Sequence, residues 1–262
     1  MDWFEEWFDS PFYEILYADR DEEEAALLVD FLEDYLSLQE RAKVLDLGCG
    51  RGRHAIHLYK KAAKKHENGY QVTGVDLSER AVTTAREQAK AEGLENIRFE
   101  VRDMRNPLPE KFDAILNLFT TFGYFKSDEE NISVLKSVKQ MLVANGIFVI
   151  DYLNAAKVRN ELQTSDEGRL KSINYRIHRY IEEDSVYKDI TFSGDNIEET
   201  RHYSERVKLY DLDWFQEKMS ANNLIIDDVF GDYKGEEFDP EKSDRLLIIS
   251  HLKADGKSGD KK

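Results

Sequence analysis

A glycine-rich segment at residues 44–52 constrains the fold of this 262-residue chain more than any other feature. Its sequence is Val-Leu-Asp-Leu-Gly-Cys-Gly-Arg-Gly, in which a short apolar strand ends and glycines follow at alternate positions. Glycine adopts positive φ angles and lets a ligand approach the backbone closely. A strand that turns on glycines into a helix is typical of open α/β sheets, which bind ligands at the carboxyl ends of their strands.

Strand and helix patterns alternate around this turn. We expect apolar strands over residues 44–47, 71–76, 97–101, 112–118 and 147–151. We expect helices over residues 21–38, from the glycine turn to about 65, over 79–92 and over 129–143. Ser78 is the expected N-cap of the 79–92 helix, and Asn145-Gly146 is expected to end the 129–143 helix. Continuous apolar strands joined by helices predict an α/β fold with a doubly wound, mostly parallel sheet.

The pattern changes after Asn160. Residues 170–181, 186–192 and 197–209 contain alternating stretches separated by short polar breaks, which predicts an antiparallel β insertion at about residues 168–209. A helix over 212–222 and strands over 224–230 and 245–252 follow. We therefore expect N-terminal lid helices over residues 1–40, one domain with an insertion over 41–253, and a disordered tail over 254–262.

Composition argues against several partners. The charge of −16 repels phosphate backbones, so we expect no nucleic-acid partner. The lysines at 60, 61, 64 and 65 have the spacing of a solvated helix end. The sequence shows neither a signal peptide nor a run of the ~20 apolar residues that span a membrane, and its one cysteine, Cys49, fits a reducing compartment. We expect a cytoplasmic protein without a membrane partner, and no His/Cys spacing indicates a metal site.

The spacing of the glycines narrows the class of ligand that the turn can bind. The order Gly48-x-Gly50-x-Gly52 differs from the G-x-G-x-x-G of dinucleotide sites, and the Gly-Lys-Ser/Thr of phosphate loops is absent. Asp46 precedes the turn, and a carboxylate beside a phosphate is repulsive. The segment therefore favours a cationic ligand group.

Acidic residues also follow the next two strands. Asp76 ends the second strand, where it can accept hydrogen bonds from two ribose hydroxyls. Asp103 follows the third strand and can accept from an exocyclic amine, while Met104 can pack on an adenine face. The alternatives are a simple turn residue at Asp76 and a plain loop at 103–104.

Taken together, these residues resemble the class I S-adenosylmethionine-dependent methyltransferases of the bacterial small-molecule type. The resemblance covers roughly Arg41 to Tyr152 and includes Asn117-Leu118-Phe119 after the fourth strand and residues 143–147 before the fifth. It implies a seven-stranded, Rossmann-like methyltransferase fold, S-adenosylmethionine as cofactor, S-adenosylhomocysteine as product, and no metal.

The resemblance also implies roles for individual residues. The backbone of Gly48 and Gly50 would face the methionine moiety, and Asp46 would meet its amino group. An N-terminal tyrosine often covers the cofactor in related enzymes, although an aromatic helix that only packs explains the segment 3–17 equally well. The expected cofactor-binding residues are Tyr13, Tyr17, Arg20, Asp46, Gly48, Cys49, Gly50, Asp76, Leu77, Asp103, Met104, Asn117 and Leu118.

The sequence says less about which residues would contact the methyl acceptor. The loop 117–125 enters the cleft, and Phe122 and Tyr124 are expected to wall the transfer site, unless they pack beneath the following helix. The insertion is expected to roof this site. It offers His202 as a substrate-side candidate, and its other polar candidates are His178, Arg179, Arg201 and Tyr203. For each of these five residues the sequence favours the alternative of a surface position.

The expected reaction is in-line transfer of a methyl group to an N or O nucleophile of a small molecule. His54 and His57 flank the first helix, but the sequence identifies no base, which favours an amine or an acidic hydroxyl as acceptor. The alternatives are a non-enzymatic S-adenosylmethionine-binding partner and a nicotinamide-dependent oxidoreductase.

Overall fold

A seven-stranded sheet forms the centre of the computed structural model, which describes residues 3–17, 22–194, 197 and 199–254. The strand order is β10-β11-β5-β4-β1-β2-β3. Strands β1 to β5 pair in parallel, whereas β11 is antiparallel to both β5 and β10. The strands are β1 (Lys43–Leu47), β2 (Gln71–Asp76), β3 (Ile97–Val101), β4 (Phe112–Asn117), β5 (Leu142–Leu153), β10 (Leu224–Phe230) and β11 (Arg245–Leu252). The predicted doubly wound, mostly parallel sheet is confirmed.

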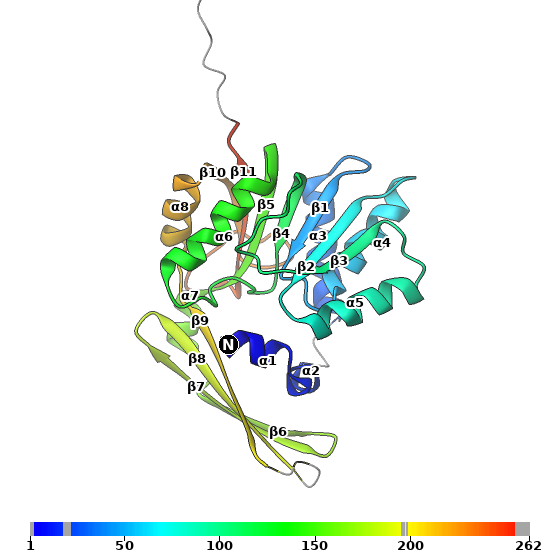
Figure 1. Ribbon diagram of the computed structural model, residues 1–262. Helices are drawn as coiled ribbons and strands as arrows, with labels where there is room; N and C mark the ends of the chain where they lie inside the picture. The colour runs from blue at the N-terminus through cyan, green and yellow to red at the C-terminus, as the bar shows by residue number, and fades with distance from the viewer. Residues whose placement is uncertain (1–2, 18–21, 195–196, 198, 255–262) are drawn as a thin grey trace, which may run out of the picture.

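Helices cover both faces of this sheet (Figure 1). One face carries α3 (Glu22–Leu36), α4 (Arg53–Lys65) and α5 (Glu79–Ala91), and the other carries α6 (Asp128–Met141) and α8 (Leu212–Ala221). Because both faces are covered, β1 is buried from Val44 to Leu47 and β4 is buried except at Asp113, and this explains their nearly continuous apolar sequences.

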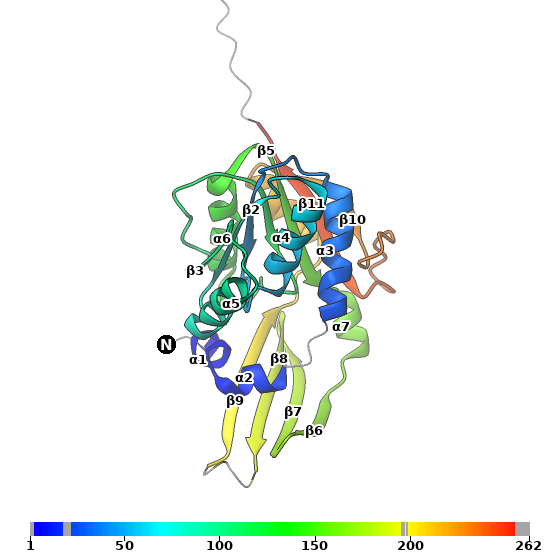
Figure 2. The same ribbon diagram turned by 90° about the vertical axis from the view of Figure 1, so that its right-hand side faces the viewer.

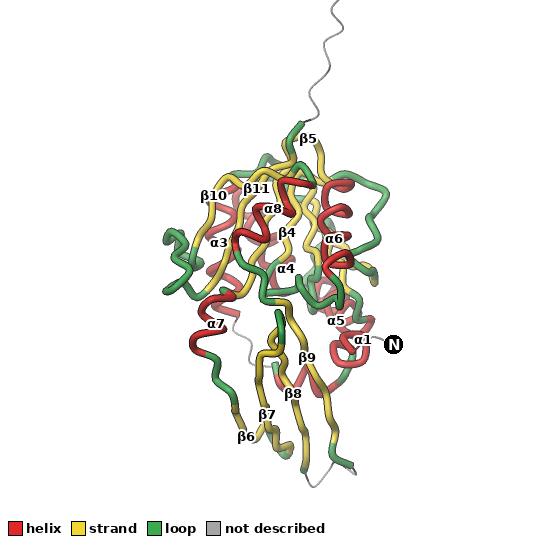
Figure 3. The backbone as a smooth tube through the Cα atoms, turned by 90° about the vertical axis from the view of Figure 1, so that its left-hand side faces the viewer, coloured by secondary structure: helices red, strands yellow, loops and turns green. Residues whose placement is uncertain are grey.

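A second sheet lies beyond the carboxyl ends of β1 and β4 (Figures 1 and 3). It is antiparallel, has the order β6-β7-β8-β9, and follows α7 (Ala155–Glu161). Its strands are β6 (Ser165–Leu170), β7 (Ile173–Glu182), β8 (Ser185–Ser193) and β9 (Arg201–Lys208). The short helices α1 (Trp3–Phe8) and α2 (Pro11–Leu16) lie between the two sheets (Figures 1 and 2). Residues 3–17, which contain both helices, are called the lid below.

Several expected boundaries are wrong. The second sheet begins at Ser165, near the expected start at about residue 168. The expected strand 170–181 corresponds to β7, whereas Leu170 is the last residue of β6, because Lys171 turns the chain at φ 57°. β6 escaped prediction because its sequence, Ser-Asp-Glu-Gly-Arg-Leu, has almost no apolar alternation. The helix before β5 ends at Met141, and Asn145-Gly146 instead lie inside β5 at an irregularity in its pairing with β4. The tail 255–262 and Arg20 lie outside the described residues.

Candidate active site

The glycine turn connects β1 to α4 and is fastened to the neighbouring strand. The N–H groups of Gly48 and Cys49 donate to the Val75 carbonyl at 2.8 and 2.9 Å. Gly48 has φ 87°, and a Cβ there would lie 2.7 Å from Thr121. Gly50 has φ 53°, and a Cβ there would meet nothing within 4 Å. The backbone at Gly50 therefore borders open space that a ligand can occupy.

Asp76 fixes the other side of this turn. Its Oδ2 accepts from the Gly50 N–H at 2.8 Å, and its Oδ1 accepts from the Ser78 N–H at 2.9 Å. Burial raises the pKa of the Asp76 carboxyl, and the backbone donors oppose that rise. Ser78 caps α5 through its hydroxyl, as predicted. The carboxylate is thus held rigidly at the tip of β2.

Asp46 lies behind the glycine turn and is only 2% exposed. Its Oδ2 has no hydrogen-bond partner among the described residues. Burial, and then the charge of Asp76, raises the pKa of Asp46 to about 7. A buried carboxylate oxygen that lacks a donor is uncommon, and it fits the approach of a cationic ligand group.

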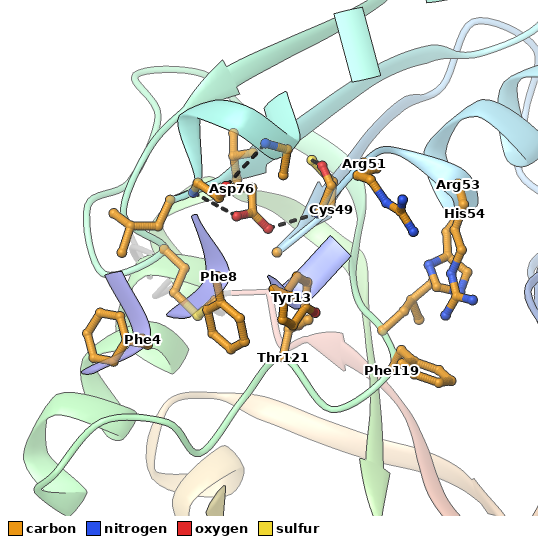
Figure 4. A pocket seen from close by; sticks show the side chains of 18 of the residues that line it. Phe4, Phe8, Tyr13, Cys49, Arg51, Arg53, His54, Asp76, Phe119 and Thr121 are labelled. Atoms are coloured by element: carbon orange, nitrogen blue, oxygen red, sulfur yellow. Dashed lines mark hydrogen bonds between the residues drawn. The ribbon is translucent and has the colours of Figure 1, made fainter. Parts of the chain in front are cut away.

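A cavity of about 290 Å³ opens over these residues, close to the lower end of the usual range for ligand pockets (Figure 4). Most of the predicted site residues line it: Tyr13, Tyr17, Gly48, Cys49, Gly50, Asp76, Leu77, Asp103, Met104, Leu118 and Tyr124. Other lining residues were not in the predicted set, and these include Phe4, Phe8, Arg51, Arg53, His54, Arg102, Phe119 and Thr121. The arginines at 51 and 53 stand beside the glycine motif, and this position was the signal available in the sequence.

The Asp103 carboxylate is held in place by a neighbouring cation. The Arg105 Nε lies 3.0 Å from Oδ1, and Nη2 lies 2.6 Å from Oδ2. Arg105 also donates to Glu130 on α6 at 2.9 Å, and its guanidinium lies 4.2 Å from the centre of the Phe125 ring. The acid that was predicted to face an exocyclic amine therefore has a fixed orientation at the cavity wall.

Comparisons with known proteins identify the class of this site. A family model described as a methyltransferase domain matches residues 38–202. The chain belongs to the class I S-adenosylmethionine-dependent methyltransferases. It is 28% identical to a putative methyltransferase of Bacillus subtilis, across 81% of this chain and 85% of that relative. Membership in this family rules against the nicotinamide-dependent oxidoreductase.

Solved structures share the fold of this methyltransferase over nearly its whole length. An S-adenosylmethionine-dependent methyltransferase from Clostridium acetobutylicum superposes with a TM-score of 0.77 at 20% identity, and covers 93% of this chain and 96% of its own. The CcbJ methyltransferase of Streptomyces caelestis gives 0.76 at 16% identity, and covers 95% and 99%. At these identities the likeness shows the fold.

Four predicted site residues of the methyltransferase do not line the cavity. One is Asp46, which lies behind the glycine turn, and the others are Asn117, Phe122 and His202. Asn117 is buried behind it and donates through Nδ2 to the Leu47 carbonyl at 2.6 Å and to Thr121 Oγ1 at 2.8 Å. Phe122 packs in the core near Tyr152 and Phe215. The loop turns sharply before Phe122, so Phe119 and Thr121 reach the cavity and Phe122 does not.

His202 is the fourth of these residues. It lies exposed on β9, and its Nδ1 is 3.3 Å from Thr191 Oγ1. Side chains alternate along a strand, so the next residue, Tyr203, faces the lid instead and packs against Trp7 with the ring centroids 4.7 Å apart and the rings tilted by 37°. His202 therefore does not line this cavity, and its substrate-side role stays a prediction.

The lid packs against the insertion and also lines the cavity. The two interpretations of residues 3–17, a packing helix and a cover over the cofactor, are therefore compatible. Trp7 is fully buried against the insertion, and its Nε1 donates to Glu205 at 2.6 Å. The Tyr17 hydroxyl donates to the same Glu205 oxygen at 2.8 Å. On the other side, Asp9 accepts from the Ser78 hydroxyl at 2.9 Å. The lid therefore connects the insertion to the start of α5 across the mouth of the site.

The remaining sequence candidates differ in their relation to the cavity. His54 is buried and lines the cavity, whereas His57 lies 3.3 Å from Asp30 on α3. The lysines on α4 form ion pairs, such as Lys61 with Asp30 at 2.6 Å and Lys65 with Glu33 at 3.0 Å. Within the described ranges there is no cluster of three or more potential metal ligands. No helix in this part of the chain is both long and apolar enough to cross a membrane.

Proposed function

We propose that this methyltransferase moves the methyl group of S-adenosylmethionine to an N or O nucleophile of a small molecule. One observation carries the proposal: a single cavity joins the glycine turn and Asp76 to an aromatic wall of Phe8, Tyr13 and Tyr124. The first part has the donors and acceptors that an adenosyl amino acid needs. The second part is an apolar chamber in which a nucleophile can be aligned.

The residues present fit S-adenosylmethionine. Asp76 would accept from the ribose hydroxyls, Leu77 and Met104 would contact the adenine, and the unpartnered oxygen of Asp46 would face the ammonium group, through water where the turn intervenes. When bound, the cofactor supplies a methyl group already activated on a sulfonium. Aromatic rings stabilise a cation near their faces by roughly 0.5–2 kcal/mol. The wall rings would therefore favour the charged donor and exclude water from it.

Enclosure supports a small acceptor. The lid and the insertion both cover the carboxyl edge of the central sheet (Figure 2), and the lid is hydrogen-bonded on two sides. Relatives include a Streptomyces venezuelae N,N-dimethyltransferase named for an amino-sugar nucleotide, which is 29% identical over 53% of this chain and 54% of its own length. Beneath the lid, alignment of the acceptor's nucleophile with the methyl group can supply on the order of 7–11 kcal/mol.

The experiment has two stages. Calorimetry should show micromolar binding of S-adenosylmethionine by the wild type, and Asp76→Ala should weaken it tenfold or more, which is about 1.4 kcal/mol. Labelled S-adenosylmethionine is then incubated with a metabolite extract, and the methylated product is identified by mass. Tyr124→Phe, which removes the hydroxyl that donates to the Thr120 carbonyl at 2.5 Å, should lower turnover, whereas Tyr180→Phe on the insertion should not.

Binding without turnover in any extract would favour the alternative of a non-enzymatic S-adenosylmethionine-binding partner. Absence of calorimetric binding by the wild type would refute both the proposed methyl transfer and the non-enzymatic alternative.

A further inference from the structure

The loop after β4 contains an unusual pair of residues. Phe119 and Thr120 have φ angles of 59° and 57°, a left-handed conformation that side chains disfavour. The Phe119 side chain lines the cavity, and the Thr120 carbonyl accepts from the hydroxyl of Tyr124, another lining residue. This pair therefore determines where two aromatic groups of the cavity wall lie. Such conformations persist only where the surroundings enforce them.

A single buried acid holds both residues. Asp151 lies near the carboxyl end of β5, and its side chain is 0% exposed. Its Oδ2 accepts from the Phe119 N–H at 2.8 Å, and its backbone carbonyl accepts from the Thr120 N–H at 2.9 Å. Both amide groups of the left-handed pair are thus satisfied by one residue.

Arg245, at the start of β11, connects the acid to the loop. Its Nε donates to Asp151 Oδ1 at 2.9 Å, and its Nη2 donates to Thr120 Oγ1 at 2.8 Å. Tyr233 donates to Asp151 Oδ2 at 2.8 Å. The guanidinium groups of Arg245 and Arg53 lie 5.6 and 4.5 Å from the centre of the Phe119 ring. Backbone and ring are both fixed by charged groups.

We propose that Asp151 and Arg245 are positioning residues of the methyltransferase, which enforce the left-handed loop that forms the cavity wall at Phe119 and Tyr124. Neither residue lines the cavity, so they act through the loop. The importance of this wall for methyl transfer rests on the proposed function. The effect on the loop itself does not, because it is a property of the ligand-free protein.

The primary test is Asp151→Asn, which keeps the shape of the side chain and removes the charge that faces Arg245. Hydrogen exchange of the ligand-free protein should show amides in residues 117–125 exchanging at least tenfold faster than in the wild type. Calorimetry with S-adenosylhomocysteine should show at least fivefold weaker binding, since Leu118, Phe119 and Thr121 line the same cavity. Asp244→Asn is the matched control. Asp244 precedes Arg245 in the sequence, and the same change there breaks an exposed ion pair with Lys157.

A rescue experiment separates positioning from general stability. Glycine adopts φ 57° without strain, so Thr120→Gly added to Asp151→Asn should recover at least half of the lost affinity on a logarithmic scale. A purely structural role for Asp151 predicts no recovery, because Thr120→Gly removes contacts and adds none.

Two outcomes overturn the proposal: Asp151→Asn that matches the wild type in exchange and affinity, or a double variant that recovers nothing. If Asp151→Asn does not fold, Arg245→Lys replaces it, since lysine keeps the charge but cannot donate to Asp151 and Thr120 through one planar fork. The proposal is then overturned if Arg245→Lys matches the wild type in exchange and affinity, or if Thr120→Gly added to Arg245→Lys recovers nothing. Failure of the wild type to bind S-adenosylhomocysteine would refute the proposed function, while exchange over 117–125 would still decide the role of Asp151.

Discussion

Replacing Asp46 by asparagine should make the ligand-free methyltransferase more stable at alkaline pH while weakening its binding of S-adenosylmethionine. The pKa of Asp46 is raised from its ordinary 3.8 to about 7 by burial and by the charge of Asp76. The folded state therefore keeps a proton that the unfolded state has lost. The free energy of unfolding of the wild type therefore falls as the pH rises from about 4 to about 7. The Asp46→Asn variant does not lose this stability, because asparagine does not ionise.

The size of the effect follows from the pKa change. An interval from 3.8 to about 7 corresponds to roughly 4 kcal/mol at alkaline pH, at about 1.4 kcal/mol for each tenfold change in proton affinity. The asparagine amide would occupy the place of Oδ2, which has no partner, and a buried unsatisfied group costs about 1–3 kcal/mol. We therefore expect Asp46→Asn to be about 1–3 kcal/mol more stable than the wild type at pH 8.5.

Urea unfolding without ligand, followed by tryptophan fluorescence at pH 5, 7 and 8.5, measures this difference. The advantage of Asp46→Asn should grow by about 2–3 kcal/mol between pH 5 and 8.5, because the other titrating groups are shared by both proteins. Calorimetry should show that wild-type affinity for S-adenosylmethionine rises through pH 7, as Asp46 ionises opposite the ammonium, whereas the variant loses this dependence. Parallel stability profiles for the two proteins would refute the reasoning.

Two further substitutions test the lid and the glycine turn. Glu205→Gln removes the negative charge that accepts the Trp7 and Tyr17 hydrogen bonds, a loss of about 1–2 kcal/mol. S-adenosylhomocysteine should therefore dissociate about 5–30 times faster from the variant in stopped-flow experiments. An unchanged dissociation rate would show that Glu205 does not hold the lid. Gly52→Ala should cost about 2–4 kcal/mol of unfolding free energy, since its φ is 82° and its Cβ would lie 2.8 Å from Phe99. Gly93→Ala, at φ 68° with no atom within 4 Å, should cost only about 1 kcal/mol, and equal losses would contradict the steric explanation.

The central sheet and the cofactor half of the site were predictable because their signals are local. The acid at the end of β2 and the glycines after β1 are each read from a few adjacent residues, and parallel strands bring their carboxyl ends together. The insertion was predicted with a strand missing, since β6 carries little apolar alternation. The end of α6 was misplaced because Asn145-Gly146, a common helix stop, here occupies an irregularity within β5.

The acceptor wall was not predictable, and the reason is physical rather than a lack of motifs. The sequence left open whether Phe122 walls the transfer site or packs beneath the following helix. In the structure the loop is left-handed at Phe119 and Thr120, and Phe122 packs in the core. That conformation is stabilised by Asp151 and Arg245, which are 32 and 125 positions away from their loop partners. A local sequence pattern cannot report such a constraint, because each loop residue taken alone prefers another backbone region. Donor recognition therefore depends on residues adjacent in sequence, and the shape offered to the acceptor depends on contacts made only after β5 and β11 have paired.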